Sequence, residues 1–149
     1  MIFYNRFKKI LPMTDSLTKE KRSWNMSRIR SKDTRPEKVV RSLLHRMGYR
    51  FRLHVKSLPG TPDIVLPKFK TVIFVHGCFW HRHPGCRFAY MPKSRVDFWM
   101  RKFAQNIKAH EKATMDLKDQ GWNVFVIWEC DLSDLDSLGR KLSNLLCEN

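Results

Sequence analysis

Residues 71–86, with the sequence TVIFVHGCFWHRHPGC, join an apolar run to a loop that is dense in histidine and cysteine. The run from Thr71 to Val75 predicts a buried strand. The twelve residues from Val75 to Cys86 hold three histidines and two cysteines around a Phe-Trp pair. Thiolates and imidazoles at short spacing bind zinc, and imidazoles at a strand end can activate water. We therefore expect a strand that ends in a metal-binding or catalytic loop.

The sequence around this stretch predicts the order helix, three strands, helix, strand, helix. Thr34, Pro36 and Glu37 form a capping box that begins a helix, and Gly48 ends it. Apolar runs and alternation then predict the other elements. These are a short helix over 23–29, strands over 49–54, 63–66, 71–76 and 122–128, a long helix over 96–118, and a last helix carrying Leu135 to Leu146. This order matches the core of the PD-(D/E)XK (restriction-endonuclease-like) architecture, an α/β fold with a mixed sheet flanked by helices.

The composition favours a single basic domain that binds a polyanion. The 149 residues include 29 Lys and Arg against 14 Asp and Glu, which gives a net charge of +15. A protein with this positive charge is expected to bind nucleic acid, and a membrane surface is the alternative. No apolar run approaches the roughly 18 residues of a membrane span. We expect a cytoplasmic protein with a basic, loosely ordered extension over 1–22, a single domain over 23–149, and cysteines used for metal rather than disulfides.

Asp63 is a candidate catalytic carboxylate. It begins an apolar strand after a Pro-Gly-Thr-Pro turn, while the next strand ends in His76. Mg²⁺ prefers oxygen ligands and shares its shell with water and substrate phosphate. The alternative is a solvated turn aspartate, which is the usual role of an isolated Asp in a turn. The acid and lysine usual on the second strand of such nucleases are missing, so a histidine has to act as the base.

Cys78, His83 and Cys86 have the spacing of zinc ligands, and Cys130 follows the last predicted strand. Four nitrogen and sulfur ligands make a closed, structural zinc site. The alternative is that these are unrelated residues of a polar loop. Cys147 is predicted to be a core residue of the last helix.

Aromatic and basic residues gather in the same segments. Phe79, Trp80 and Trp99 can stack on bases or wedge between base pairs, and ordinary core burial is the alternative. The basic residues around them suit a DNA backbone, and a solvated face is the alternative.

Several motifs together resemble the very-short-patch-repair (Vsr) DNA mismatch endonucleases. They are Pro-Gly-x-Pro-Asp at 59–63, His-Gly-Cys-Phe-Trp-His at 76–81, Phe-Trp-x-x-Lys at 98–102, Gly-Trp at 121–122 and Trp-Glu-Cys at 128–130. The resemblance runs from about Ser23 to Cys130. It implies an enzyme that nicks one strand 5′ to the T of a T:G mismatch, which arises by deamination of 5-methylcytosine. It also implies a PD-(D/E)XK-like fold with a structural zinc, catalytic Mg²⁺ and a double-stranded DNA substrate.

The resemblance also assigns roles to individual residues. Asp63 and the backbone carbonyl of Val75 are the implied Mg²⁺ ligands, and His81 is the implied general base. His76 lies near the scissile phosphate, and Glu37 helps to order a metal-bound water. The implied zinc ligands are Cys78, His83, Cys86 and Cys130, and the implied DNA-binding residues are Phe79, Trp80, Trp99, Met26, Lys102 and Asn106.

Three positions depart from the family pattern. Val75 stands where the family often has Thr, and Pro84-Gly85 adds one residue between zinc ligands. His110 stands where the family has the Asp that supports the general base, and Glu111 or Asp97 is a possible substitute. Two other functions stay open, a restriction-type endonuclease on matched DNA and a non-catalytic, zinc-stabilised DNA-binding module. We further expect a monomer with a functional link to mismatch-repair proteins and a cytosine-5 DNA methyltransferase.

Overall fold

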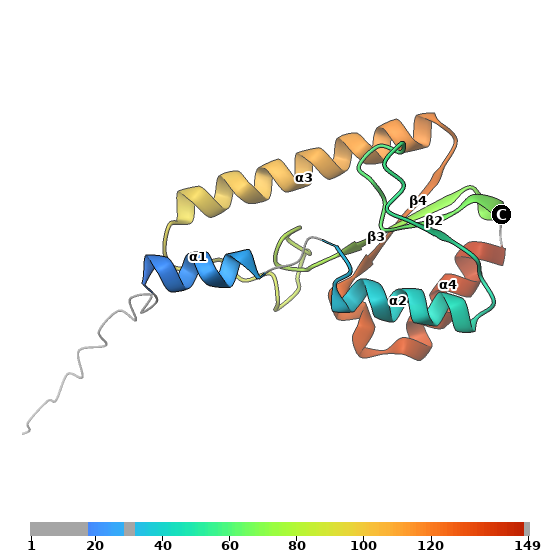
Figure 1. Ribbon diagram of the computed structural model, residues 1–149, viewed down its shortest axis with the longest axis horizontal. Coiled ribbons are helices and arrows are strands. Elements are labelled where there is room, and N and C mark those ends of the chain that lie inside the picture. Colours follow the sequence, from blue (N-terminus) through green and yellow to red (C-terminus); the bar gives the residue numbers. More distant parts are fainter. Residues whose placement is uncertain (1–17, 29–31, 148–149) are drawn as a thin grey trace, which may run out of the picture.

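The computed structural model describes residues 18–28 and 32–147 (Figure 1). The helices are α1 (Lys19–Ser27), α2 (Arg35–Arg46), α3 (Val96–Asp119) and α4 (Leu135–Cys147). The strands are β1 (Arg52–Leu53), β2 (Ile64–Leu66), β3 (Thr71–His76) and β4 (Asn123–Trp128), with short 3-10 helices η1 (Pro67–Phe69) and η2 (Glu129–Ser133). The mixed α/β fold predicted from the sequence is confirmed.

The strands form one mixed sheet in the order β1-β2-β3-β4 within the described ranges. Strands β1, β2 and β3 pair antiparallel, whereas β3 and β4 pair parallel, with His76 opposite Trp128. A parallel pair needs a long crossover, and α3 supplies it. As a result, the chain leaves β3 and β4 at the same edge of the sheet, and the loops that follow them lie together.

The sheet is covered on both faces, because its strands alternate between two apolar sets. Ile64, Ile73 and Ile127 face α2 and α4, where they pack with Val40, Leu44, Leu138 and Leu142. Val65, Val72 and Phe74 face the other way and pack with Leu117 of α3. Figure 1 shows the three layers, with α3 on one side of the sheet and α2 and α4 on the other.

Helix α2 begins as the capping box predicts. The Thr34 hydroxyl accepts a hydrogen bond from the Glu37 backbone N–H, and the Glu37 carboxylate accepts one from the Thr34 N–H. The chain leaves the helix at Gly48, whose φ of 88° lies in the left-handed region that glycine adopts readily.

Two local predictions need correction. The strand expected over 49–54 shrinks to Arg52–Leu53, because Tyr49 and Phe51 pack against the α2–α4 core and the backbone of His54 turns to a φ of 46°. Cys147 is exposed, not buried. The buried stripe of α4 is spaced at 138, 142 and 146, and the next residue points about 100° away from it.

The N-terminal prediction is tested only in part. Helix α1 begins at Lys19, so it starts inside the segment assigned to the extension and spans the expected division at 22/23. Residues 1–17 and 29–31 lie outside the described residues, and the extension stays a prediction. Among the described residues, the helices are all too short or too polar to cross a membrane.

Candidate active site and metal centre

A cleft of about 700 Å³ opens between the start of α2, the β2–β3 edge and the middle of α3. All four predicted catalytic residues line it, namely Glu37, Asp63, His76 and His81, together with Val75 and the predicted wedge residue Trp80. The fold therefore brings together residues that lie up to 44 positions apart in the sequence.

Asp63 lies at the start of β2, beside the end of the antiparallel strand β3. Its Oδ2 accepts a hydrogen bond from the Val75 N–H at 2.8 Å. Burial raises the pKa of this carboxyl to about 6, the Val75 bond opposes that shift, and the charge of Glu37 adds to it. A carboxylate whose pKa is raised by burial and by a second carboxylate is stabilised in its charged form by a nearby cation, so Asp63 is a suitable ligand for a hard cation. Val75 lines the same cleft.

The loop before Asp63 is fixed by its approach to α3. Gly60 has a φ of 70°, and a Cβ there would lie 2.6 Å from the Cβ of Ala113. Only glycine allows the loop to pack this closely against the helix. This contact sets the direction from which Asp63 enters the cleft.

Glu37 performs the capping role and also reaches the cleft. Its carboxylate accepts bonds from the backbone N–H of Asp33 and from the Thr34 hydroxyl, and it pairs with Arg41 at 2.6 Å. The side chain is 4% exposed. Glu37 is therefore held in place by neighbours on α2, and the predicted double role fits its position.

His76 and His81 stack in the cleft, with ring centroids 3.6 Å apart and planes 8° from parallel. Strand β3 delivers His76, and the loop returns His81 over it through a bond from the His81 N–H to the Gly77 carbonyl. Burial, then the charges of neighbouring histidines, lowers the pKa of His76 to about 2 and that of His81 to about 4. Both imidazoles are therefore neutral near pH 7, the form in which one can accept a proton and the other can donate a hydrogen bond.

His110 does not replace the carboxylate expected at its position. Its ring centroid lies 4.3 Å from that of His76 and 6.2 Å from that of His81. The Nδ1 of His81 is buried without a hydrogen-bond partner among the described residues. Glu111 and Asp97 are exposed on α3, outside the cleft lining, so neither supplies the missing bond.

The four predicted zinc ligands converge. The ligand atoms of Cys78, His83, Cys86 and Cys130 all lie within 4.8 Å of one another. The Nδ1 of His83 is 3.2 Å from Cys130 Sγ and 3.7 Å from Cys78 Sγ. These separations suit the corners of a tetrahedron around one ion, so the residues fit a metal with a preference for sulfur and nitrogen.

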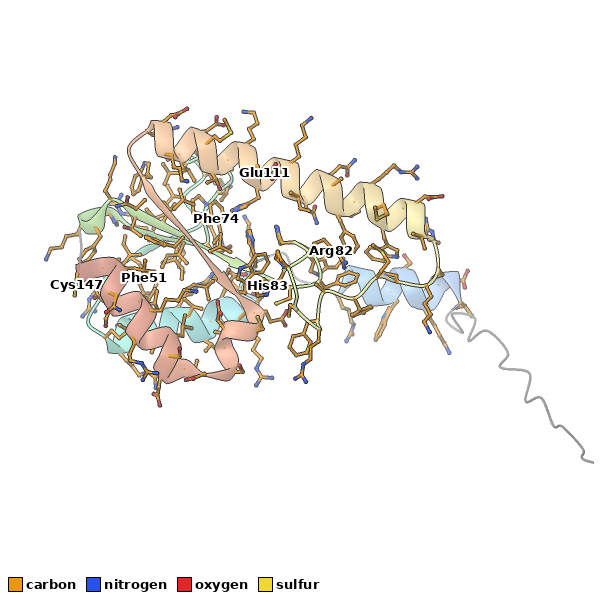
Figure 2. The ribbon with its side chains drawn as sticks, turned by 180° about the vertical axis from the view of Figure 1, so that it is seen from behind. Phe51, Phe74, Arg82, His83, Glu111 and Cys147 are labelled. Atoms are coloured by element: carbon orange, nitrogen blue, oxygen red, sulfur yellow. The ribbon has the colours of Figure 1, made fainter. Side chains whose placement is uncertain are left out.

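The sheet explains why this cluster forms. The parallel register of β3 and β4 places Cys78 and Cys130, each two residues past the His76–Trp128 pair, at one edge. The His83 N–H bonds to the Cys78 carbonyl, and the His83 ring stacks on Trp128 with centroids 4.2 Å apart. Stacking fixes the ring with Nδ1 close to the Cys78 and Cys130 thiols, and Figure 2 shows His83 beside the end of β4. Between His83 and Cys86 the chain turns at Gly85, whose φ of 69° glycine adopts readily.

The predicted wedge residues form one aromatic cluster. Phe79 lies 5.2 Å from Trp80 and 5.3 Å from Trp99, centroid to centroid. All three are half-buried, so the cluster supports itself and still presents ring edges. The Tyr90 ring is tilted by 40° against Phe79, with centroids 5.1 Å apart, and Tyr90 is 64% exposed.

The other DNA-binding predictions differ in their surroundings. Asn106 donates a hydrogen bond from Nδ2 to the Trp80 carbonyl at 3.1 Å, so it connects α3 to the loop that carries Phe79 and Trp80. Lys102 is exposed on the same helix. Met26 belongs to α1, and its side chain lies outside the part that the structure describes.

Sequence reasoning missed Arg41, His54, Tyr90 and the cleft-lining Glu129. Arg41 had a signal, because it stands four residues after Glu37 on a helix, the spacing of an ion pair. His54 had none, since only the tertiary structure brings it beside Asp63, with His54 Nδ1 4.0 Å from Asp63 Oδ1.

The chain is similar to a known family and to several named proteins. The family model described as DNA mismatch endonuclease Vsr matches residues 14–87. The type II nicking enzyme V.XorIIP of Xanthomonas oryzae pv. oryzae is 55% identical over 90% of this chain and 98% of its own length. The type II nicking enzyme V.NmeAIP of Neisseria meningitidis is 43% identical over 91% of this chain and 96% of its own. The DNA mismatch endonuclease Vsr of Escherichia coli is 40% identical over 85% of this chain and 80% of its own.

The family-model match covers Glu37, Asp63, His76 and His81 of the cleft and ends before Cys130. The relatives are named as nicking enzymes or as a mismatch endonuclease. The basic charge, the mixed sheet and the converging carboxylate and histidines fit that chemistry. The chain belongs to the Vsr family of DNA mismatch endonucleases.

Proposed function

We propose that this protein nicks one strand of double-stranded DNA, 5′ to the T of a T:G mismatch, as a monomer in very short patch repair. The observation that carries the proposal is the single cleft that holds Asp63, His76 and His81 with the wedge residue Trp80 on its wall. A hydrolytic centre beside an aromatic wedge suits a reaction that first distorts the duplex. The name of the E. coli relative, a DNA mismatch endonuclease, supports the choice of a mismatch.

Binding begins with charge. A net charge of +15 attracts the phosphate backbone over long range, and Lys102 lies exposed on the helix that borders the cleft. Phe79, Trp80 and Trp99 then insert their rings at a weak base pair. A T:G pair costs less to unstack than a matched pair, so the wedge favours mismatched sites.

Hydrolysis then depends on groups in the cleft. Asp63 and the Val75 carbonyl would hold a Mg²⁺ ion, which when bound would supply positive charge near the scissile phosphate. Glu37, fixed by its bonds on α2, accepts hydrogen bonds from water in this part of the cleft. Neutral His81 accepts the proton of the attacking water, and neutral His76 donates a hydrogen bond to the phosphate.

Zinc is the proposed occupant of the cysteine cluster. Three thiols and one imidazole leave no open coordination position, which is typical of structural zinc. Its role is to hold the loop that carries His81, Phe79 and Trp80, because Cys78 is the only fully buried residue over 77–95.

A strand-resolved nicking assay tests the proposal. Duplexes with one T:G mismatch in varied contexts, each strand labelled in turn, are compared with T:A and C:G controls, with and without added Mg²⁺. Chelators are left out, because they would also remove zinc. We expect cleavage of the T strand alone, only with Mg²⁺, and its loss in Asp63→Ala but not in Asp119→Ala, a change at an exposed aspartate of α3.

The same assay separates the other functions. Cleavage of both strands of matched DNA would identify a restriction-type enzyme. The Nδ1 of His81 has no hydrogen-bond partner in the part of the chain that the structure describes, which favours a second candidate, a DNA-binding module without catalysis. Tight binding of T:G duplexes without cleavage at any Mg²⁺ concentration would identify that candidate.

A further inference from the structure

Arg41 places a buried positive charge beside the cleft. Its Nη1 pairs with Asp33 Oδ1 at 2.5 Å, and its Nη2 pairs with Glu37 Oε2 at 2.6 Å. The same Nη2 lies 2.9 Å from His54 Nε2. The Arg41 side chain is 12% exposed, and its Nε has no hydrogen-bond partner among the described residues. The guanidinium is therefore oriented by these three neighbours.

Asp33, Glu37 and His54 resemble a second metal site, since their ligand atoms lie within 4.8 Å of one another. Arg41, however, bonds to each of these three side chains. The guanidinium already supplies the positive charge that a metal ion would bring to these ligands. This cluster is therefore better explained as a support for Glu37 than as a place for another ion.

The Arg41 contact fixes the tautomer of His54. A guanidinium can only donate, so the Nε2 of His54 has to accept, and the proton of the neutral ring lies on Nδ1. That Nδ1 lies 4.0 Å from Asp63 Oδ1. This distance is too long for a hydrogen bond. The partial positive charge of the Nδ1–H still lies near the Asp63 carboxylate and is attracted to it.

Each oxygen of the Asp63 carboxylate therefore has an N–H group near it. The Val75 N–H bonds to Oδ2 at 2.8 Å, and the His54 N–H faces Oδ1. The backbone of His54 has a φ of 46°, an uncommon conformation for a residue other than glycine. Such strain persists where the surroundings determine it, and here it turns the ring from β1 into the cleft.

We propose that Arg41 and His54 are positioning residues for the cation site. Arg41 fixes both Glu37 and the His54 ring, and His54 orients Asp63 toward the ion. The inference rests on the proposed function, because it assumes that Asp63 binds a divalent cation. Groups that orient a metal ligand in this way commonly change metal affinity about 10-fold to 100-fold when they are lost.

Binding of Mn²⁺ tests the inference without relying on activity. Free Mn²⁺ is measured by electron paramagnetic resonance during titration of the zinc-loaded, full-length chain, and Asp63→Asn identifies the signal of this site. We expect His54→Leu and Arg41→Gln to weaken Mn²⁺ binding about tenfold. His54→Asn keeps an N–H near Nδ1, and Arg41→Lys keeps the charge, so each restores part of the affinity.

Exposed neighbours on α2 supply matched controls. His45→Leu and Arg46→Gln change the same residue types, and both positions are exposed in the last turn of the helix. They are expected to leave Mn²⁺ binding unchanged. The thermal midpoint without Mn²⁺ shows whether each variant is folded, and His54→Asn and Arg41→Lys decide the question if the larger changes prevent folding.

The outcomes separate the two proposals. If wild type binds Mn²⁺ at the Asp63 site and the folded His54 and Arg41 variants bind it equally well, this inference is wrong and the proposed function stands. If wild type shows no binding that Asp63→Asn removes, the proposed function loses its cation site and the inference fails with it. Weaker binding in the variants, with restoration by Asn and Lys, supports both.

Discussion

Replacing Asp63 with asparagine is expected to stabilise the fold at neutral pH. The carboxylate is 19% exposed, and burial raises its pKa from an ordinary 3.8 to about 6. Ionising it in the folded protein therefore costs about 3 kcal/mol more than in the unfolded chain. Asparagine has nearly the same shape and removes the charge, and its carbonyl oxygen still accepts the Val75 N–H bond.

The sign of the pH dependence follows from this pKa. The unfolded chain loses its Asp63 proton near pH 3.8, and the folded chain holds it to about pH 6. Wild type therefore loses stability as the pH rises through this window, whereas the asparagine variant does not. We expect the variant to be more stable by about 1–3 kcal/mol at pH 7.5, with about 1 kcal/mol of that gain appearing between pH 5 and pH 7.

Urea unfolding at pH 5, 6 and 7.5 measures the difference, in buffer without added magnesium or chelator. Asp119→Asn, at an exposed end of α3, is the control and is expected to change stability by less than about 0.5 kcal/mol. Millimolar Mg²⁺ should stabilise wild type and leave the Asp63 variant unaffected. A variant that is less stable than wild type at pH 7.5, or a difference that does not vary with pH, would refute the reasoning.

Three further predictions concern the metal sites and the wedge. We expect about one tightly bound zinc per chain, and we expect Cys130→Ala, but not Cys147→Ser, to lose both the zinc and cooperative folding. Metal analysis and thermal unfolding check this, and a stable, zinc-free wild type contradicts it. Trp80→Ala should lower the rate of nicking of T:G duplexes about tenfold or more, since stacking contributes about 1–3 kcal/mol per base. Met115→Ala, at an exposed position, should not change this rate, and equal nicking by both variants argues against a wedge. Below pH 6 protons compete for Asp63, so the Mg²⁺ concentration for half-maximal nicking should rise about tenfold per pH unit; a requirement that stays constant from pH 7 to pH 5 would exclude Asp63 as the ligand.

The fold makes Cys147 a suitable control for Cys130 of the cysteine cluster. Cys147 lies at the far end of the molecule from His83, as the labels in Figure 2 show. Both cysteines in the comparison are free thiols, so a difference between their variants reports on the site and not on the loss of a thiol.

Much of the fold could be predicted from local pattern. The capping box at Thr34 defined the start of α2, because the two residues that satisfy each other are three positions apart. Apolar runs located β2, β3 and β4, and a stripe repeating every three or four residues located α3 and α4. The strand over 49–54 failed because Tyr49 and Phe51 serve the core of a neighbouring layer, which alternation alone does not reveal.

The candidate site also has parts that local sequence predicts and parts that it does not. The convergence of Cys78, His83, Cys86 and Cys130 was predictable, since three of them lie within nine residues and thiols and imidazoles at such spacing are typical of a metal site. The supporting group for His81 was not, because whether His110 reaches it depends on how α3 crosses β3. In the folded chain His110 packs against His76 instead.

The sequence by itself determined the residue types, their order and the family, because motif chemistry and strand periodicity are local properties. The tertiary structure alone decided which charges meet. Arg41 on α2, His54 after β1 and Asp63 before β2 come from three separate segments. They face one another only because antiparallel pairing of β1, β2 and β3 and the packing of α2 on the sheet bring their side chains to one cleft.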